Sequence, residues 1–293
     1  MSQLVLNALI AGSLAALIAG GLALVYGVMG IFNMALGQMA LFGGYMTWWF
    51  RVSLGQSLPV SILLGLCCGA LLSWLTFRVF VEPFVRYHRW LPIVTTIAWG
   101  MILDGLILLL FQERPASILP GLESPVRILG GQLTMSQITL ILATLSLLAI
   151  FAVILHATAY GRRIRAVVQH PHAAMSLGIH ALRLRQMLFI ASGTLAAAGG
   201  IFIGIDQNLT PTLAFPLTIK AYAAVIAGGR GSLYGAILCA YVIALLEQLL
   251  VGVTWFGAYT IPAGYQSAVA LFLIIGFLLV RPHGIFGSPL RTA

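Results

Sequence analysis

Charged side chains are scarce in this sequence. Only 7% of its 293 residues are Asp, Glu, Lys or Arg, whereas a soluble globular domain has about 25%. This deficit excludes a soluble fold, because too few charges remain to cover a surface that faces water. Hydrophobic residues make up 61% of the chain, and apolar stretches long enough for a helix to cross a hydrocarbon layer of about 30 Å recur along it. The sequence therefore predicts a polytopic membrane protein.

The sequence also lacks the ten-residue segments of alternating hydrophobicity that are typical of membrane β-barrels. Its apolar runs are continuous, so we expect an all-α polytopic transmembrane helix bundle, a single domain over residues 1–293 with eight or nine membrane segments. The second and seventh segments contain glycine and polar residues, and either of them can be broken or re-entrant if protein or water covers the freed backbone groups. The expected segments are residues 4–25, 28–50, 58–80, 91–112, 134–156, 186–205, 214–229, 232–252 and 264–280.

Lysine is nearly missing as well. Lys220 is the only one, so the net charge of +9 comes almost entirely from arginine. Basic residues in short loops between apolar spans mark the cytoplasmic side. Residues 78–89, residues 156–186 and the C-terminal tail are therefore predicted to be cytoplasmic, and residues 113–127 and 206–215 to lie outside. A strictly alternating nine-segment bundle then has its N-terminus outside. This topology explains the charge without nucleic acid, since there is no soluble basic domain.

Motifs that support catalysis are missing too. The glycine-rich run at residues 227–232 lacks the lysine and the spacing of a GxxxxGK[ST] phosphate-binding loop, so we do not expect this chain to hydrolyse ATP. The three cysteines lie in apolar spans without a CxxC motif and are expected to be small buried apolar residues. His170 and His172 have no Cys, Asp or Glu nearby, which argues against a metal site. We expect no catalytic residues and no cofactor bound by this chain.

A few ionisable residues lie within the apolar spans, where such groups are costly and are functional candidates by default. Asp104 lies near the middle of the fourth span, and two interpretations stay open: its carboxylate lines a wet pathway, or it pairs with another group for structure. Glu247 lies towards the outer end of its span and can reach the interface. For Lys220, snorkelling or a bond to freed carbonyls is as plausible as contact with a substrate.

The second segment brings amide side chains to membrane depth. Asn33 and Gln38 lie among four glycines, so the backbone there is flexible and the amides can line a pathway. The alternative is helix packing, with glycine at helix crossings and the amides forming hydrogen bonds between helices.

The cytoplasmic break between the fifth and sixth segments is too long for a minimal turn and too short for a domain. Its apolar residues predict two short amphipathic helices. Pro171 can begin the second of them and Gly178 is placed to end it. Helices that lie along the membrane surface explain this pattern. Helices that dock in a cleft of another protein explain it equally well.

Four runs of the sequence resemble one family. The break and the span after it read GRRIRAVVQHPHAAMSLGIHALRLRQMLFIASGTLAAAGGIF. This run resembles the cytoplasmic coupling loop and following helix of bacterial permeases for branched-chain amino acids, the hydrophobic amino acid uptake class of ABC importers. The other runs are similar to further parts of that family: GLALVYGVMGIFNMALGQMALFGGYM, KAYAAVIAGGRGSLYGAILCAYVIALLEQLL and LLVRPHGIFG. The matches cover most of the chain in the family's order.

The resemblance implies a multi-pass permease subunit of an ATP-driven importer in the bacterial inner membrane, with a pathway for branched-chain or related small amino acids. Such a chain is not an enzyme, because cytoplasmic ATP-binding subunits bind and hydrolyse the ATP. The other implied partners are a second permease subunit, expected to be a homologue, a periplasmic solute-binding protein and membrane lipid. The alternatives are a stand-alone secondary transporter or channel for a small polar solute, a urea or amide import permease, and a membrane-embedded enzyme.

The resemblance also assigns residues. The coupling loop covers about residues 157–185, and His172, Ala173, Ala174 and Gly178 occupy the EAA and Gly positions of the motif that seats on the ATPase, with His172 in place of the glutamate. The residues expected to couple to the ATPase are Gly161, Arg162, Arg163, Arg165, Ala166, His172, Ala173, Ala174 and Gly178. The residues expected along the pathway are Asn33, Gln38 and Asp104, and the family often has Gln at the last position.

Overall fold

The protein, described here by a computed structural model, is built almost entirely of helices. In chain order the elements are α1 (Ser2–Met29), α2 (Leu36–Trp48), the π-helical turn η1 (Trp49–Ser53), α3 (Leu58–Thr76), the π-helical turn η2 (Phe77–Val81), α4 (Glu82–Val85), α5 (Leu91–Phe111), β1 (Val126–Ile128), β2 (Gly131–Leu133), α6 (Met135–Ala157), α7 (Ala159–Gln169), α8 (Pro171–Ser176), α9 (Ala181–Asp206), the 3₁₀ turn η3 (Pro211–Leu213), α10 (Ala214–Gly228) and α11 (Leu233–Gly252). The structure describes residues 2–88, 90–112, 115–119, 126–128, 130–169, 171–229 and 231–252, with single positions and short stretches between 265 and 286.

Seven helical segments in the described part are long and apolar enough to cross a membrane. This confirms the predicted all-α membrane bundle. The number is smaller than the eight or nine expected for two reasons. The second segment is broken, and α2 has 13 residues, short of the roughly 20 that a crossing needs. The last expected segment, residues 264–280, falls largely outside the described residues.

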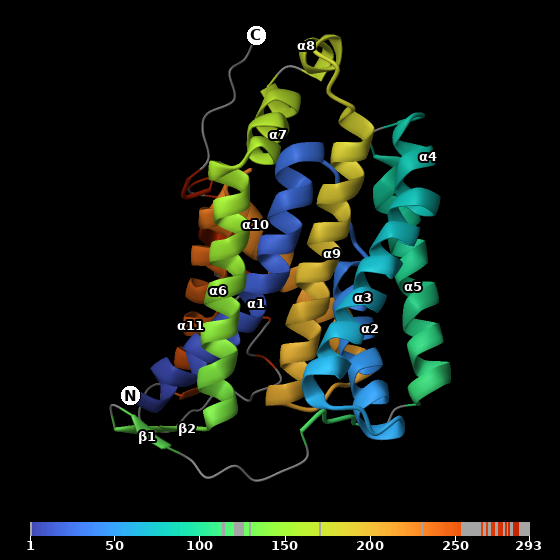
Figure 1. Cartoon of the computed structure of the whole chain (residues 1–293). Coiled ribbons are helices and arrows are strands. Elements are labelled where there is room, and N and C mark those ends of the chain that lie inside the picture. Colours follow the sequence, from blue (N-terminus) through green and yellow to red (C-terminus); the bar gives the residue numbers. More distant parts are fainter. Residues whose placement is uncertain are drawn as a thin grey trace.

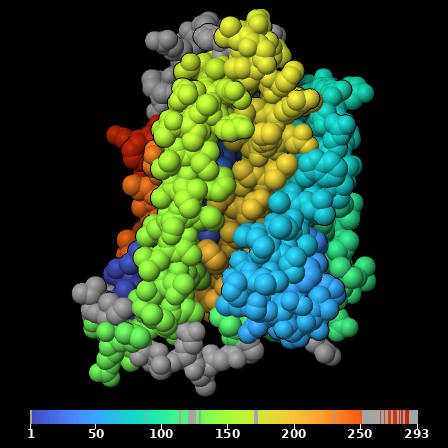
Figure 2. Space-filling model, viewed as in Figure 1, coloured from blue at the N-terminus to red at the C-terminus, as the bar shows by residue number. Residues whose placement is uncertain are grey.

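The two most buried helices, α1 and α9, form the centre of the bundle (Figure 1). α1 packs against α9, α10 and α11, and α9 packs against α2 and α3. α5 and α6 lie on the flanks and leave many of their apolar side chains exposed. Figure 2 shows α6 standing forward on one face, with a furrow between it and α3 in which α9 is seen. The flanking helices therefore offer apolar surfaces that fit lipid or another membrane subunit.

Glycines set the spacing between the central helices. A Cβ on Gly200 of α9 would overlap the carbonyl oxygen of Ala40 in α2. A Cβ on Gly43 or on Gly69 would come within 3 Å of the side chain of Ala197 in α9. Small residues at these positions let the helix backbones touch, which is how membrane helices gain contact area without a hydrophobic driving force.

The two ends of the bundle differ in what they carry. At one end Gln3, in the first turn of α1, exchanges two hydrogen bonds with the backbone of Gln132 in β2: its Nε2 donates to the carbonyl at 3.1 Å, and its Oε1 accepts from the N–H at 2.8 Å. Ala116 pairs with Leu209 in an isolated β-bridge at the same end. α7 and α8 lie at the opposite end (Figure 1). This arrangement agrees with the predicted orientation, in which the N-terminus lies outside and the arginine-rich break lies in the cytoplasm.

A capping box starts α6 directly after the β1–β2 hairpin. The Thr134 Oγ1 accepts from the backbone N–H of Gln137, and the Gln137 Oε1 accepts from the backbone N–H of Thr134. We expect Thr134→Ala to remove one of these bonds and to cost about 1 kcal/mol of stability. The midpoint of thermal unfolding in detergent should fall by about 2–4 °C. Thr139→Ala is the matched control, because the exposed Thr139 hydroxyl bonds the Met135 carbonyl within its own helix and caps no helix end. An equal fall in both variants would contradict the capping role.

Candidate functional site

The chain between α1 and α2 runs without helical structure inside the bundle. α1 ends at Met29, Gly30 adopts a positive φ of 61°, and α2 begins only at Leu36. Ile31, Asn33 and Ala35 in this stretch are buried. Irregular backbone at membrane depth is tolerated only where protein or water satisfies its polar groups. The second segment is therefore broken, which is one of the two forms expected for it.

Side chains from two other helices satisfy the N–H groups at the start of α2. The Thr96 Oγ1 of α5 accepts from the N–H of Met34 at 3.2 Å, and the Thr218 Oγ1 of α10 accepts from the N–H of Gly37 at 3.0 Å. Gly37 is the second residue of α2, whose N–H a helix leaves without an internal partner, and Met34 lies in the turn just before the helix. α5 and α10 are thus tied to the break through two hydroxyl groups.

Asn33, one of the residues expected along the pathway, is used within this turn. Its Oδ1 accepts from the N–H of Ala35 at 3.2 Å, and its Nδ2 lies 3.6 Å from the Met39 sulfur. The side chain is fully buried. Its polar atoms therefore hold the turn between the two helices.

Gln38 and Asp104, the other two expected pathway residues, are in direct contact. The Gln38 Nε2 donates to the Asp104 Oδ2 at 3.0 Å. Gly100 lies one turn before Asp104 on α5, and the Gln38 amide packs against it. Among the described residues, no donor reaches the Gln38 Oε1 or the Asp104 Oδ1. The pair thus leaves two acceptor oxygens buried and without a donor at the junction of α2 and α5.

The surface of α5 beside this pair is open. Met101 is 70% exposed, and a Cβ on Gly105 would meet nothing within 4 Å in the described part of the chain. Asp104 itself is partly exposed. A carboxylate with a free oxygen inside a membrane is not expected to face lipid. Because its Oδ1 is buried within this chain, the carboxylate turns its unpaired oxygen inward rather than to the open surface of α5.

The arginine-rich break forms two short helices, α7 and α8, as the sequence predicts. Pro171 is the first residue of α8, and Gly178 follows its end with a φ of 78°. The N–H of Ile179 bonds the Ala174 carbonyl at 3.1 Å, and the N–H of Gly178 bonds the Met175 carbonyl at 3.0 Å. This is the Schellman pattern that ends a helix at a left-handed glycine.

The apolar face of α7 is covered by the bundle itself. Ile164 and Val167 of α7 pack with Ala174 of α8 and with the first turns of α9. The face that amphipathicity predicts is therefore buried against this chain. Apolar residues left facing outwards include Val168, Met175 and Leu177. Leu177 belongs to the apolar pattern that predicts the two helices, yet it is 81% exposed.

The residues expected to couple to the ATPase have different surroundings. A Cβ on Gly161 would overlap the Leu155 carbonyl, so glycine is required where α6 meets α7. The Arg165 guanidinium donates to that same carbonyl at the end of α6. Arg162, Arg163 and Ala173 are exposed, Ala166 is partly buried, and Ala174 is buried. The side chain of His172 lies outside the described residues.

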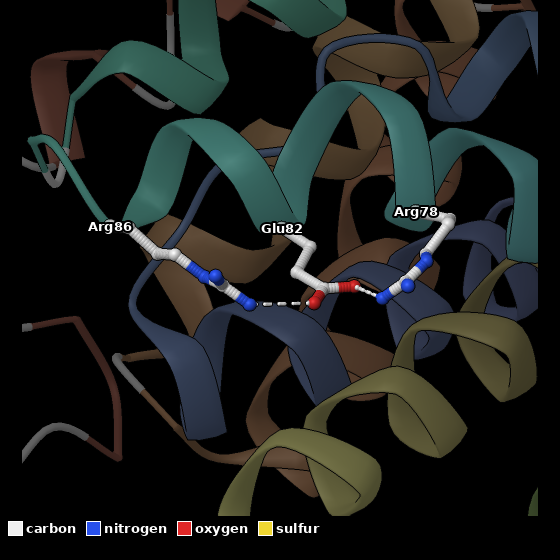
Figure 3. A network of polar contacts seen from close by, with 3 residues as sticks. All are labelled: Arg78, Glu82 and Arg86. Carbon is white, nitrogen blue, oxygen red and sulfur yellow. Dashed lines mark hydrogen bonds and ion pairs between the residues drawn. The ribbon is translucent and has the colours of Figure 1, made fainter.

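The other predicted cytoplasmic break carries an ion-pair network that the sequence reasoning did not foresee. Glu82 Oε2 lies 2.6 Å from Arg78 Nη1, and Glu82 Oε1 lies 3.0 Å from Arg86 Nη2 (Figure 3). The Glu82 side chain is only 5% exposed, whereas both arginines are largely exposed. One buried carboxylate therefore orients two guanidinium groups at the corner between α3 and α5, at helical i, i+4 spacing.

Lys220 and Glu247 form an ion pair between α10 and α11. The Lys220 Nζ lies 2.9 Å from Glu247 Oε1 and 3.0 Å from Oε2. The expectation that Glu247 reaches the interface is not met, because its side chain is 8% exposed and turned to Lys220. Lys220 bonds a carboxylate rather than freed carbonyls. The contact depends on how two helices pack, which is why each residue looked isolated in the sequence.

Comparison with known proteins gives a consistent result. Residues 4–278 match the model of a family described as "Branched-chain amino acid transport system / permease component". The chain is 27% identical to the high-affinity branched-chain amino acid transport system permease protein BraD of Pseudomonas aeruginosa, over 98% of this chain and 96% of that protein. It has the same identity and coverage against LivH of Escherichia coli, which carries the same description.

Two further matches carry other descriptions. The autoinducer 2 import system permease protein LsrC of Enterobacter sp. is 30% identical over 77% of this chain and 64% of that protein. A solved structure, "PsaBC from Streptococcus pneumoniae in complex with Fab", aligns with a TM-score of 0.49 at 13% identity, over 92% of this chain and 89% of that one.

Proposed function

Because the chain belongs to the family of permease components of branched-chain amino acid transport systems, we propose that it forms the pathway of an ATP-driven importer for branched-chain or related small amino acids. The carrying observation is the family match over residues 4–278, with relatives that align to 98% of the chain. The protein is a multi-pass component of the bacterial inner membrane. ATP is bound and hydrolysed by separate cytoplasmic subunits, and a periplasmic solute-binding protein delivers the substrate.

The coupling loop is proposed to dock into a cleft of the ATP-binding subunit through α8 and the turn after it. Met175 and Leu177 are exposed apolar side chains at the end where the arginines gather, and an apolar helix face that enters a groove is a common recognition mode. The buried cluster around Ile164 and Ala174 joins α7 and α8 to α9. When the ATP-binding subunits close, a push on α8 is then carried to the central helix of the bundle.

The pathway is proposed to run past Gln38 and Asp104. Two of their oxygens have no donor and are buried in this conformation, so a movement of α5 that uncovers them would offer them to an ammonium group or water. The open α5 surface beside them is where the second permease subunit would complete a polar channel. Asn33 contributes by holding the break that positions α2, since its own polar atoms are bonded.

Reconstitution of the complete importer tests this proposal. The chain would be co-expressed with the second permease and the ATP-binding subunits of its operon, placed in proteoliposomes, and supplied with the solute-binding protein and radiolabelled leucine. We expect uptake that requires ATP and the ATP-binding subunits. Uptake driven by an ion gradient without those subunits would support a secondary transporter instead. Competition by urea or short amides, but not by leucine, would support an amide permease.

A further inference from the structure

A cavity of about 260 Å³ lies within this subunit between α1, α9, α10 and α11. It is reached near the end of the bundle that carries the β1–β2 hairpin, since Asp206 at the end of α9 and Gln137 at the start of α6 line it. Its volume is close to the lower end of the range of roughly 300–1,000 Å³ that is typical of small-molecule sites. α11 and α5 lie on opposite sides of the bundle (Figure 1), so this cavity is separate from the Gln38–Asp104 pair.

Charges of both signs line the cavity. The Lys220 ammonium and the Glu247 carboxylate form the ion pair between α10 and α11, and the Lys220 side chain keeps 25% of its surface exposed. Asp206 adds a second carboxylate, and its Oδ1 accepts from the Gln137 Nε2 at 2.9 Å. Ile10, Leu14 and Ile243 supply apolar walls.

Helix packing alone does not require this ion pair. A buried ion pair gives little or no net stability compared with apolar side chains of the same size, because both charges lose their hydration. α10 and α11 already meet closely at Gly228 and Gly235, where a Cβ on either glycine would overlap the backbone of the other. Among the described residues it is also the one ion pair that joins two membrane helices, since Glu82 pairs only within its own segment. The Lys220–Glu247 pair lines a cavity and is not needed for packing, so it is a candidate binding site for a ligand.

We infer that this cavity binds a zwitterionic α-amino acid with an apolar side chain from the outer side. The ligand carboxylate bonds the Lys220 ammonium, the ligand ammonium lies between Glu247 and Asp206, and the side chain packs on the apolar walls. Charge-assisted bonds of this kind are the strong ones in a partly desolvated site. The inference rests on the proposed import of amino acids, and it adds a second binding site outside the pathway.

Protection of an introduced thiol tests the site directly. Ala244 lines the cavity, so Ala244→Cys would be placed in a background of Cys67→Ala, Cys68→Ala and Cys239→Ala, and labelled from the outside with a water-soluble thiol reagent. We expect leucine at about ten times its Kd or more to slow the labelling at least about tenfold, because an occupied cavity shields the thiol and the rate falls by a factor of one plus the ratio of the leucine concentration to Kd. Analogues of leucine that lack either the ammonium or the carboxylate should protect at least about tenfold less well. A thiol that does not react from outside, or that leucine does not protect, would overturn the inference.

Variants separate a binding role from a structural one. Lys220→Met with Glu247→Leu should leave the folded, monodisperse protein intact and abolish protection by leucine. Two variants serve as matched controls. Asp104→Asn alters the proposed pathway and not the cavity. Tyr241→Phe removes the hydroxyl that lies 2.9 Å from the Ser13 hydroxyl, a polar contact between α1 and α11. Both should keep full protection. Unchanged protection in the apolar double variant would show that the ion pair is structural. If that variant fails to fold, the protection measured with the leucine analogues still tests whether the cavity recognises the ammonium and the carboxylate.

The outcomes also separate this inference from the proposed function. Leucine import by the reconstituted wild type without protection of the thiol would overturn the cavity site alone. Protection without import would overturn the proposed transport function and leave the site standing. If neither is observed, both are wrong.

Discussion

ATP-driven uptake should fall at least about tenfold when Leu177 is replaced by aspartate, because a charge enters the surface proposed to dock on the ATP-binding subunit. Leu177 is 81% exposed and lies past the end of α8, so the change removes no packing within this chain. Membrane insertion and thermal stability should therefore stay at the wild-type level. The measurement is leucine uptake by the complete importer, together with co-purification of the ATP-binding subunits.

Leu177→Met is the matched control, since it keeps an apolar side chain of similar size and should retain uptake. Gly178→Val gives a second probe of the same turn. No described atom lies within 4 Å of a Cβ at this position, but the positive φ of 78° disfavours a β-branched residue by about 1–2 kcal/mol and would redirect Leu177. Normal uptake by both Leu177→Asp and Gly178→Val would remove α8 from the proposed docking surface.

Ala174→Leu is expected to act differently. Ala174 is buried among the residues of α7 and α9, so a larger side chain overpacks that cluster at a cost of about 1–3 kcal/mol. Uptake should fall together with thermal stability, whereas in Leu177→Asp it should fall alone.

Asp104→Asn should lower the rate of leucine uptake or raise its KM by about tenfold or more, because it removes the charge next to the proposed pathway. An asparagine Oδ1 can still accept the Gln38 amide bond that Asp104 accepts at 3.0 Å, so the packing of α2 on α5 should persist. Uptake would be measured over a range of leucine concentrations, which separates the two kinetic parameters.

A combined Gln38→Leu and Asp104→Leu variant is the decisive comparison. If the pair serves only to pack two helices, apolar side chains of similar size should support folding and transport equally well. If the pair lines the pathway, this variant should fold and fail to transport. Unchanged uptake by Asp104→Asn at every concentration would assign Asp104 to structure.

The positions of several helices could be read from the sequence because they depend on local runs of residues. The span expected at residues 91–112 is α5, Leu91–Phe111, and the span expected at 232–252 is α11. The break in the second segment was also foreseeable, since glycine and asparagine disfavour a continuous helix locally. The end of α8 at Gly178 follows from the same local chemistry.

The contacts between distant residues could not be read in this way. Gln38 meets Asp104 across 66 positions of sequence, and Lys220 meets Glu247 across 27. Each contact depends on the rotation of two helices about their axes, and spans that are apolar on all sides carry no clear pattern that fixes this rotation. For α7 the pattern correctly predicted a buried face. It did not say that α9 of the same chain covers that face.

The two threonine hydroxyls at the start of α2 limit how this protein can change shape. If α5 or α10 moved away from the break, the N–H groups of Met34 and Gly37 would lose their hydroxyl acceptors, which costs about 1–3 kcal/mol for a buried group left without a partner. α2, α5 and α10 are therefore expected to travel as one rigid block during a transport cycle. Any hinge must then lie elsewhere, and cross-links between Thr96 or Thr218 and the break should leave the cycle running.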